Sequence, residues 1–169
     1  KLTSLNLMSN AVGDKGLLLL AESPNLSQLE SLNLESTGIT ALGILALAQS
    51  SHLNRLREIN LCGNDLREKG LRILASSGNF KNLVKLRVSG VPVGDSGFQA
   101  LVRSHTLSKL EELEIMGNTI TRQSLDSLVN TSKLEQLKKL DLRRNKLKEA
   151  DLIFLADSPK FQDLDVLRF

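Results

Sequence analysis

The chain has 169 residues, of which 41% are hydrophobic and 24% are charged, a composition typical of one soluble globular domain. Its 22 basic and 19 acidic side chains leave a formal net charge of +3, which is too balanced to predict a nucleic-acid partner or an anionic membrane partner. The single cysteine, Cys62, excludes a disulfide within the chain and favours a reducing compartment, so we expect a cytoplasmic protein.

A leucine recurs every 27 residues along the whole chain without a shift in register. These leucines are Leu2, Leu29, Leu56, Leu83, Leu110, Leu137 and Leu164. Each one opens the pattern L-x-x-L-x-L, with an apolar residue at each L, and this alternation predicts a short strand at 2–7 and at the equivalent residues of every repeat. The fixed period predicts six complete repeats and the start of a seventh at 164.

The strand of each repeat is followed by a bend. Counting the recurring leucine as position one, position nine is asparagine in four repeats, where a buried amide can satisfy backbone groups of the bend. These asparagines are Asn10, Asn64, Asn118 and Asn145. Thr37 and Val91 break the pattern.

A helix follows the bend, because positions sixteen and nineteen are apolar in every repeat and a three-residue step is helical. We expect the helices to begin near Asp14, Thr40, Asp95 and Thr121, whose side chains can accept hydrogen bonds from the free amides of a first turn. Glycine at position fifteen of four repeats, as in Gly16, predicts close helix packing. The apolar run 17–21 is far shorter than the ~20 residues of a membrane-spanning helix.

One repeat alone cannot bury its leucines, so stacked neighbours must cover them, which predicts an α/β solenoid with parallel strands along one face and helices along the other. These residues resemble the leucine-rich-repeat superfamily, specifically its helix-backed, ribonuclease-inhibitor-like branch. The Gly-Asp-x-Gly motifs and Ser-Pro at 23–24 and 158–159 are similar to bacterial members. The resemblance covers the whole chain. It implies one domain, 1–169, forming a right-handed superhelix shaped as a horseshoe or arc, with the sheet on the concave face, within a longer protein.

The outward positions of the predicted sheet place opposite charges on neighbouring strands. At position three these are Glu58, Lys85, Glu112 and Lys139, and position five sets Arg87 beside Glu114 and Asp141 beside Arg168. Position two sets Glu30 beside Arg57, and Glu111 beside Lys138 and Asp165. Two interpretations stay open: a solvated face whose charges pair with one another, or a face that selects a partner by charge complementarity.

Positions seven and eight form a strip of low charge along one rim of the predicted sheet. Its members are Met8, Cys62, Gly63, Ser89, Gly90, Met116 and Gly117, and we include Glu35 in the candidate partner-binding set. Methionine adapts to partners and glycine permits close approach, which favours a docking edge, although small residues also suit a tight bend. The strip ends at Arg143 and Arg144, where Lys138, Lys139, Lys146 and Lys148 add a basic cluster that suits an acidic peptide or phosphate.

Catalytic chemistry is not indicated by the sequence. His52 and His105 are the only histidines, both in return loops about 10 Å apart, and a zinc site needs more ligands. Cys62 lies at the other end of its strand from His52, so we expect a plain exposed thiol rather than an activated nucleophile. We therefore expect no enzyme activity, cofactor or metal.

The resemblance implies a monomeric module that binds another protein, and a bacterial effector delivered into a host cytoplasm is one form of it. An alternative is a regulator of a small GTPase that supplies Arg67 or Arg122 in trans. A third is a structural or targeting domain of a larger enzyme.

Overall fold

A computed structural model describes residues 1–131, 133–162 and 164–169. Seven strands and six helices alternate along the chain. The strands are β1 (Ser4–Asn6), β2 (Ser31–Asn33), β3 (Glu58–Asn60), β4 (Lys85–Arg87), β5 (Glu112–Glu114), β6 (Lys139–Asp141) and β7 (Val166–Arg168). The helices are α1 (Gly13–Ala21), α2 (Ala41–Gln49), α3 (Arg67–Ser76), α4 (Gly94–Val102), α5 (Arg122–Asn130) and α6 (Glu149–Ala156). Short 3-10 helices follow α1, α3 and α6 at Pro24–Leu26, Gly78–Phe80 and Pro159–Phe161.

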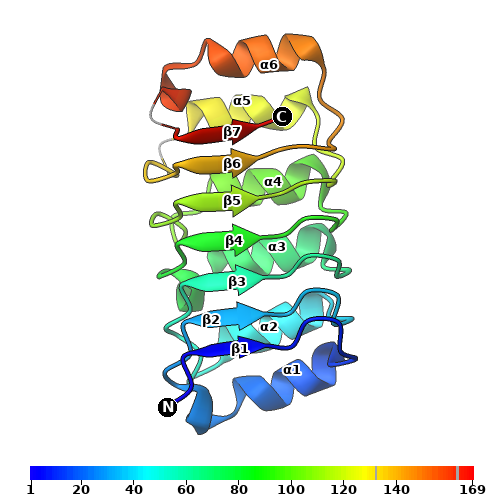
Figure 1. The fold of residues 1–169 in the computed structure, drawn as a ribbon, viewed down its shortest axis with the longest axis vertical. Helices are drawn as coiled ribbons and strands as arrows, with labels where there is room; N and C mark the ends of the chain where they lie inside the picture. Colours follow the sequence, from blue (N-terminus) through cyan, green and yellow to red (C-terminus); the bar gives the residue numbers. More distant parts are fainter. Residues whose placement is uncertain (132, 163) are drawn as a thin grey trace.

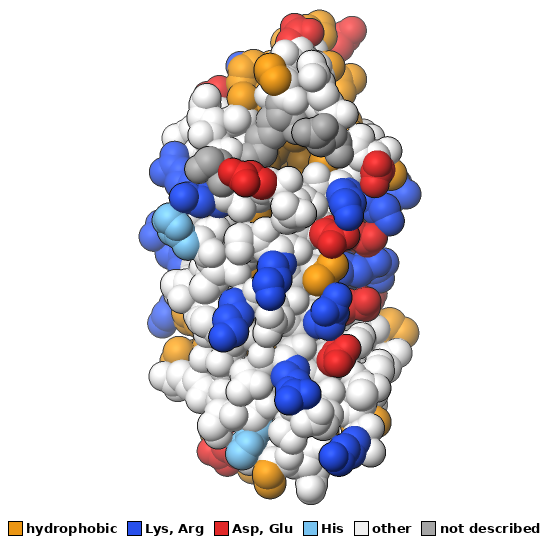
Figure 2. All heavy atoms as spheres, turned by 90° about the vertical axis from the view of Figure 1, so that its left-hand side faces the viewer, with side chains coloured by type: hydrophobic (Ala, Val, Ile, Leu, Met, Phe, Trp, Pro, Cys, Tyr) orange, Lys and Arg blue, Asp and Glu red, His pale blue; other side chains and the backbone are white. Residues whose placement is uncertain are grey.

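The strands form one parallel sheet in chain order, and the helices lie behind it as a second layer (Figure 1). Each strand pairs with the next in a register of 27 residues, so Ser4 lies opposite Ser31 and Ser31 opposite Glu58. The repeat period therefore sets the register, and the predicted leucine-rich-repeat solenoid is confirmed. Figure 2 shows the side of the molecule on which the return loops, which join each helix to the next strand, lie.

The core lies between the sheet and the helix layer. The recurring residues Leu29, Leu56, Leu83 and Leu110 are fully buried, as are the strand residues Leu86 and Leu113 on the inner face of the sheet. Each such leucine contributes roughly 1.5 to 3 kcal/mol by burial. The end repeats are less covered, since Leu2 is 45% exposed and Leu152 is 39% exposed, although the sequence pattern places both among core positions.

The asparagine at position nine behaves as predicted in the interior repeats. The Asn64 amide donates to the carbonyls of Leu34 and Leu61, and its Oδ1 accepts from the backbone amides of Thr37 and Ile39. Each of these asparagines therefore joins its own bend to the previous one. Asn10 is exposed and bonds only to carbonyls of its own repeat.

The predicted helix caps are wrong at two positions. Asp14 and Asp95 do not cap the helices in which they lie, which begin after Val12 and Val93 without a side-chain cap. Instead, Asp14 accepts from the backbone amides of Thr40 and Gly43, at the start of the next helix. Stacking brings the first turns of successive helices together, and a period of 27 residues places this carboxylate beside the next set of free amides. The prediction for Thr40 and Thr121 is confirmed, since each hydroxyl accepts from an amide of its own helix.

Glycine at position fifteen is a close-packing site, as predicted. A Cβ on Gly70 would lie 3.6 Å from the backbone Cα of Ala41, and one on Gly97 would lie 3.5 Å from the Cα of Glu68, while each would also press on a side chain of its own bend at under 3 Å. The missing side chain lets neighbouring helices approach. In the part of the chain described, none of the helices has the length and apolar character needed to cross a bilayer.

Candidate functional site

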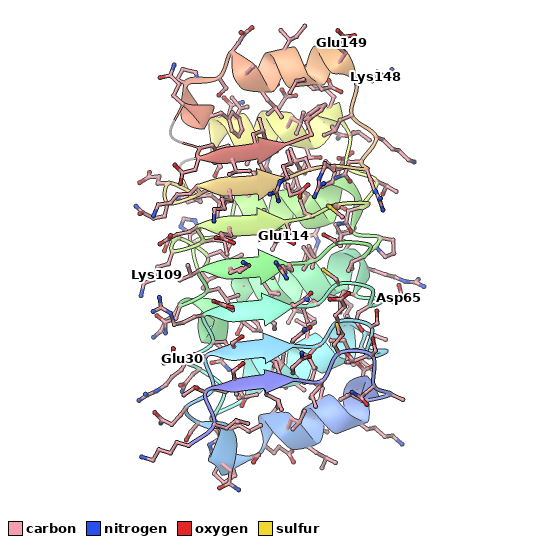
Figure 3. All side chains as sticks on the ribbon, viewed as in Figure 1. Glu30, Asp65, Lys109, Glu114, Lys148 and Glu149 are labelled. Carbon is pink, nitrogen blue, oxygen red and sulfur yellow. The ribbon has the colours of Figure 1, made fainter. Side chains whose placement is uncertain are left out.

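The outer face of the sheet is the largest candidate binding surface. No helix covers it, and positions three and five of each strand project from it (Figure 3). We call this surface the open sheet face; it is the face predicted to be concave. Two shallow hollows lie on it, one of about 170 Å³ over β2, β3 and β4 and one of about 230 Å³ over β4 to β7.

The charges on the C-terminal half of the open sheet face pair with one another. Glu112 accepts from Lys85 at 2.7 Å and from Lys139 at 2.7 Å, so one carboxylate lies between two ammonium groups on the flanking strands. Hydrogen bonds from Lys139 and then Lys85 lower the pKa of Glu112 to about 2. Arg87 pairs with Glu114 at 3.0 Å on the adjacent row. Cross-strand charge pairing is thus confirmed for these residues.

The pairing does not extend along the whole predicted ladder. Glu58 lies opposite Lys85 in the register, but the Lys85 ammonium turns to Glu112, and within the described residues Glu58 has no ion pair. Glu30 and Arg57 likewise lie beside each other without an ion pair. The N-terminal half of the face therefore has little self-neutralised charge, and uncharged side chains dominate it. They are Ser4, Asn6, Ser31, Asn33 and Asn60.

Asp141 is the most enclosed charge at the C-terminal end of the open sheet face. Its carboxylate lies 2.6 Å from the Arg143 guanidinium and 3.5 Å from that of Arg168. Burial alone would raise the pKa of Asp141, but the hydrogen bonds from Arg143 and the charge of Arg168 outweigh it and lower the pKa. Lys138 forms an ion pair with Glu111 as well. Half of the predicted basic cluster is therefore paired with carboxylates of this chain, namely Lys138, Lys139 and Arg143. Arg144, Lys146 and Lys148 are its exposed members without an ion pair among the described residues.

The rim consists of repeat positions seven and eight, at the C-terminal ends of the strands, and the backbone bends tightly there. Position eight has a positive φ in all six bends, from 52° to 66°. These residues are Ser9, Ser36, Gly63, Gly90, Gly117 and Arg144. Glycine adopts this left-handed conformation at low cost, so, of the two interpretations left open by the sequence, the tight bend accounts for these glycines.

Position seven supplies the side chains of the rim, and hydrogen bonds link successive repeats there. Glu35 accepts from the Asn60 amide at 2.9 Å, Cys62 Sγ accepts from the Ser89 backbone amide at 3.3 Å, and Ser89 Oγ accepts from the Met116 backbone amide at 3.1 Å. Met8 is the most open apolar member, 45% exposed. The rim is therefore an ordered edge rather than a set of independent loops.

Cys62 differs from the expected exposed thiol. Its side chain is half-buried, and burial raises the pKa of the thiol, with a smaller opposing effect of the Ser89 amide. A thiol with a raised pKa is a poor nucleophile at neutral pH. His52 and His105 lie in return loops, away from the rim, and the described residues contain no group of three or more His, Cys, Asp or Glu that could hold a metal ion.

The two arginines considered for action in trans are both engaged. Arg122 lies 3.4 Å from Asp151 and stacks over the Phe154 ring at 3.5 Å, so it joins α5 to α6. Arg67 is exposed but binds Asp65 through two of its nitrogens. Arg122 is therefore a packing residue on the helix side, away from the open sheet face.

One recurring feature was missed in the sequence. Position twenty-two is serine or threonine in every repeat, and in four of them the hydroxyl donates to a carbonyl near the end of the previous repeat's helix, namely in Ser50, Ser77, Ser104 and Thr131. Ser77 Oγ donates to Ala48 O at 3.0 Å, and Thr131 Oγ1 donates to Val102 O at 2.8 Å. The recurrence of serine or threonine at this position could have indicated a structural role for the hydroxyl. The role of the hydroxyl depends on the stacked neighbour and is visible only in the fold.

Comparisons with known proteins agree with the fold. A family model described as Leucine Rich repeat matches residues 1–21 and 26–48. No curated protein matches the sequence. The crystal structure of internalin C2 from Listeria monocytogenes is 25% identical with a TM-score of 0.69, and the match covers 100% of this chain and 62% of that one. The chain thus spans less than two thirds of the internalin chain.

A second similar structure is the Arabidopsis receptor kinase HAESA in complex with a peptide hormone and a co-receptor. It is 22% identical with a TM-score of 0.55, and the match covers 99% of this chain and 26% of that one, so the likeness concerns the fold. The repeat period, the in-register parallel sheet and the matched repeats lead to one assignment. The chain has the leucine-rich-repeat solenoid fold, and its first two repeats match the Leucine Rich repeat family model.

Proposed function

We propose that this chain is a protein-protein interaction module that binds its partner through the open sheet face and the adjoining rim. The observation that carries the proposal is the uncovered sheet: seven strands expose one face, and all six helices lie behind the other. The likeness to internalin C2, and to a receptor kinase that holds a peptide hormone and a co-receptor, supports the proposal.

The two halves of the face suit different parts of an interface. On β1 to β3, Ser31, Asn33 and neighbouring polar side chains can exchange hydrogen bonds with a partner without breaking an ion pair. On β4 to β6, a partner meets carboxylates and cations that already neutralise one another, such as Glu112 between Lys85 and Lys139. We infer that the paired half contributes orientation and that the polar half, with Met8 on the rim, contributes most of the close contact.

A steric block tests the proposal. The partner is first obtained by affinity capture with the wild-type chain, and its binding constant is then measured for two variants. Ser31→Trp adds a large side chain to the open sheet face, and Gln123→Trp adds the same side chain to the exposed surface of α5. We expect Ser31→Trp to weaken binding by at least about tenfold and Gln123→Trp to leave it within about twofold. Equal affinity for both variants would contradict the proposal.

The rim is tested separately. Met116→Glu places a charge on the rim, and the paired variant Arg143→Glu with Arg144→Glu reverses its basic end. Unchanged capture of the partner by both variants would remove the rim from the binding surface and leave the sheet face alone.

A further inference from the structure

Several Lys and Arg side chains lie on the edge formed by the return loops, at the opposite ends of the strands from the rim. The edge consists of the central return loops, residues 49–57, 76–84 and 103–111. They contain five Lys or Arg residues, namely Arg55, Arg57, Lys81, Arg103 and Lys109, and one acidic residue, Glu111. The whole chain has a net charge of only +3, so this edge is more basic than the protein as a whole. Figure 2 shows Lys and Arg side chains spread over the middle of that side.

The cations on this edge are not neutralised. Arg55 donates to the Gln28 side-chain carbonyl at 2.8 Å, Lys109 donates to that of Asn82 at 2.9 Å, and Arg103 donates to Ser127 Oγ at 2.8 Å. All three acceptors are uncharged. Within the described residues, none of the five cations forms an ion pair, and Glu111 pairs with Lys138 instead. The cations of the open sheet face differ in this respect, because each of them binds a carboxylate, as do Lys85, Arg87 and Lys139.

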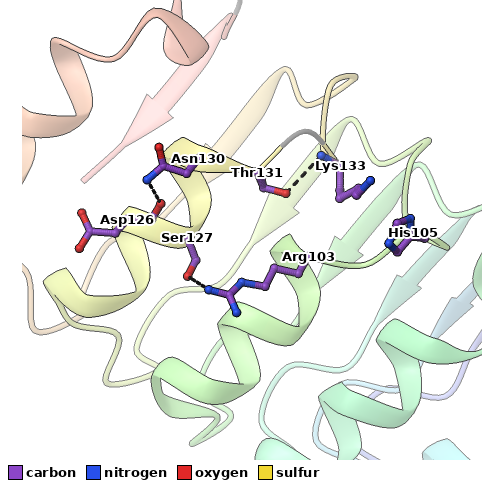
Figure 4. Close-up of a pocket in the computed structure, with 7 residues that line it drawn as sticks. All are labelled: Arg103, His105, Asp126, Ser127, Asn130, Thr131 and Lys133. Carbon is purple, nitrogen blue, oxygen red and sulfur yellow. Dashed lines mark hydrogen bonds between the residues drawn. The ribbon is translucent and has the colours of Figure 1, made fainter.

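The edge is also hollowed where the helices end. A cavity of about 490 Å³ lies between the ends of α4 and α5, and its lining includes Arg103, His105, Asp126 and Lys133 (Figure 4). A second cavity of about 550 Å³ lies between α3 and α4 and includes Arg72. Arg103 and His105 line both cavities, so the two cavities lie side by side, and together we call them the trough.

The helix ends along the trough do not repel an anion as free helix ends would. A helix C-terminus normally presents unpaired carbonyl oxygens with partial negative charge. Here the Ala75 carbonyl accepts from the Ser104 hydroxyl, and the Val102 carbonyl accepts from the Thr131 hydroxyl. The recurring hydroxyl at position twenty-two therefore occupies acceptors that would otherwise face a ligand, and Asp126 is the single carboxylate in the lining.

We propose that the trough and the basic return loops form a second docking surface, which binds an acidic segment of a protein in extended conformation. Arg55 and Lys109 occupy the same repeat position two repeats apart, so they lie about 10 Å from each other along the stack. An extended chain in the polyproline II conformation advances about 3.1 Å per residue with three residues per turn, so carboxylates three residues apart lie on one side of it at about this spacing. The charges select an acidic chain by complementarity.

Two other polyanions fit the edge less well. A membrane surface favours exposed apolar anchors beside the cations, but the large exposed apolar residues of the described chain lie outside the two cavities. A single-stranded nucleic acid is bound mainly by aromatic side chains that stack on its bases, and neither cavity has a Phe, Tyr or Trp in its lining.

The probe for this surface is a fluorescein-labelled oligo-glutamate peptide, with an oligo-glutamine peptide as the uncharged control, and binding is measured by fluorescence anisotropy. Two variants reverse charges on the edge: Arg103→Glu with Lys133→Glu in the trough, and Lys81→Glu with Lys109→Glu in the loops. The matched control is Lys15→Glu with Lys69→Glu, which changes the net charge equally on the exposed surfaces of α1 and α3. Circular dichroism and urea unfolding establish that each variant is folded.

We expect the wild type to bind the oligo-glutamate peptide and not the oligo-glutamine peptide. Each edge variant should weaken binding by at least about tenfold, and the control variant by less than about threefold. Equal losses in the edge and control variants would mean that net charge alone is responsible and would overturn the proposal. Absence of binding at about 0.05 M salt would overturn it as well. So would tighter binding of anionic lipid vesicles or of an oligonucleotide than of the acidic peptide.

Discussion

The Asp14 carboxylate accepts hydrogen bonds from both the backbone amide and the hydroxyl of Thr40, at 2.8 and 2.7 Å, although the two residues belong to different repeats. Asp95 and Thr121 repeat the arrangement at 2.8 and 2.6 Å. In each pair the aspartate belongs to a Gly-Asp-x-Gly segment and the threonine begins the next helix. Loss of one such carboxylate should therefore destabilise the contact between two repeats.

We predict that Asp14→Ala lowers the free energy of unfolding by about 1 to 2 kcal/mol, because the amides of Thr40 and Gly43 lose their acceptor. Urea unfolding measures the change. Glu22→Ala is the control, since Glu22 is exposed and also lies in the first repeat. A loss no larger than that of the control would show that the cap between repeats contributes nothing.

A second prediction concerns the pH dependence of Glu112. Its folded-state pKa is lowered to about 2 from an ordinary value of 4.5, so the ion pairs contribute stability above pH 4.5 that is lost as the pH falls through the folded pKa. Glu112→Gln should lower the free energy of unfolding at neutral pH by on the order of 1 kcal/mol. The difference between wild type and variant should shrink steadily from pH 4.5 towards pH 2. A difference that stays constant over this range would contradict the assignment.

Arg144 adopts a left-handed conformation, φ 59°, at the position where three other repeats have glycine. Arg144→Gly should raise the free energy of unfolding by up to about 1 kcal/mol, because a side chain in this conformation costs roughly 1 to 2 kcal/mol and the greater freedom of unfolded glycine offsets part of the gain. Gly117→Ala, with φ 64° at the same position, should lower it. Thermal unfolding measures the stability of both variants. If the two substitutions changed the stability in the same direction, backbone strain would not be the cause.

The C-terminal repeat should open first. In α6, Leu152 is 39% exposed and Ile153 is 58% exposed, and the residues of β7 are at most half-buried, so fewer apolar contacts hold this end. Hydrogen exchange should be faster in residues 149–162 and 164–169 than in residues 56–113. Equal protection in the two regions would contradict this expectation.

The period of 27 residues was sufficient to predict the strand register, the buried leucines and the asparagine contacts of Asn64 and Asn118. It was also sufficient to predict which charges share a row, as with Lys85 and Glu112. It did not predict which carboxylate pairs with Lys85, because Glu58 and Glu112 lie opposite Lys85 on the two flanking strands. The caps formed by Asp14 and Asp95 and the partial burial of Cys62 depend on contacts between stacked repeats, which a pattern within one repeat does not contain.

The glycines of the rim show a related difficulty. Gly63 and Gly90 were open to two interpretations, a docking edge or a tight bend, since glycine is common in both. The positive φ values identify the bend as the reason for glycine. The trough beside Arg103 was not predicted, because its lining comes from different repeats and no motif in the sequence marks it.

Hydrogen-deuterium exchange of the chain with and without its captured protein partner tests the central claim most directly. If the partner binds the open sheet face and rim, the backbone amides of residues 7–10, 34–37, 61–64 and 88–91 should exchange more slowly in the complex than in the free chain. The exposed surfaces of α1 to α5 should be unchanged. Slower exchange confined to the helices, with the rim unaffected, would contradict the account.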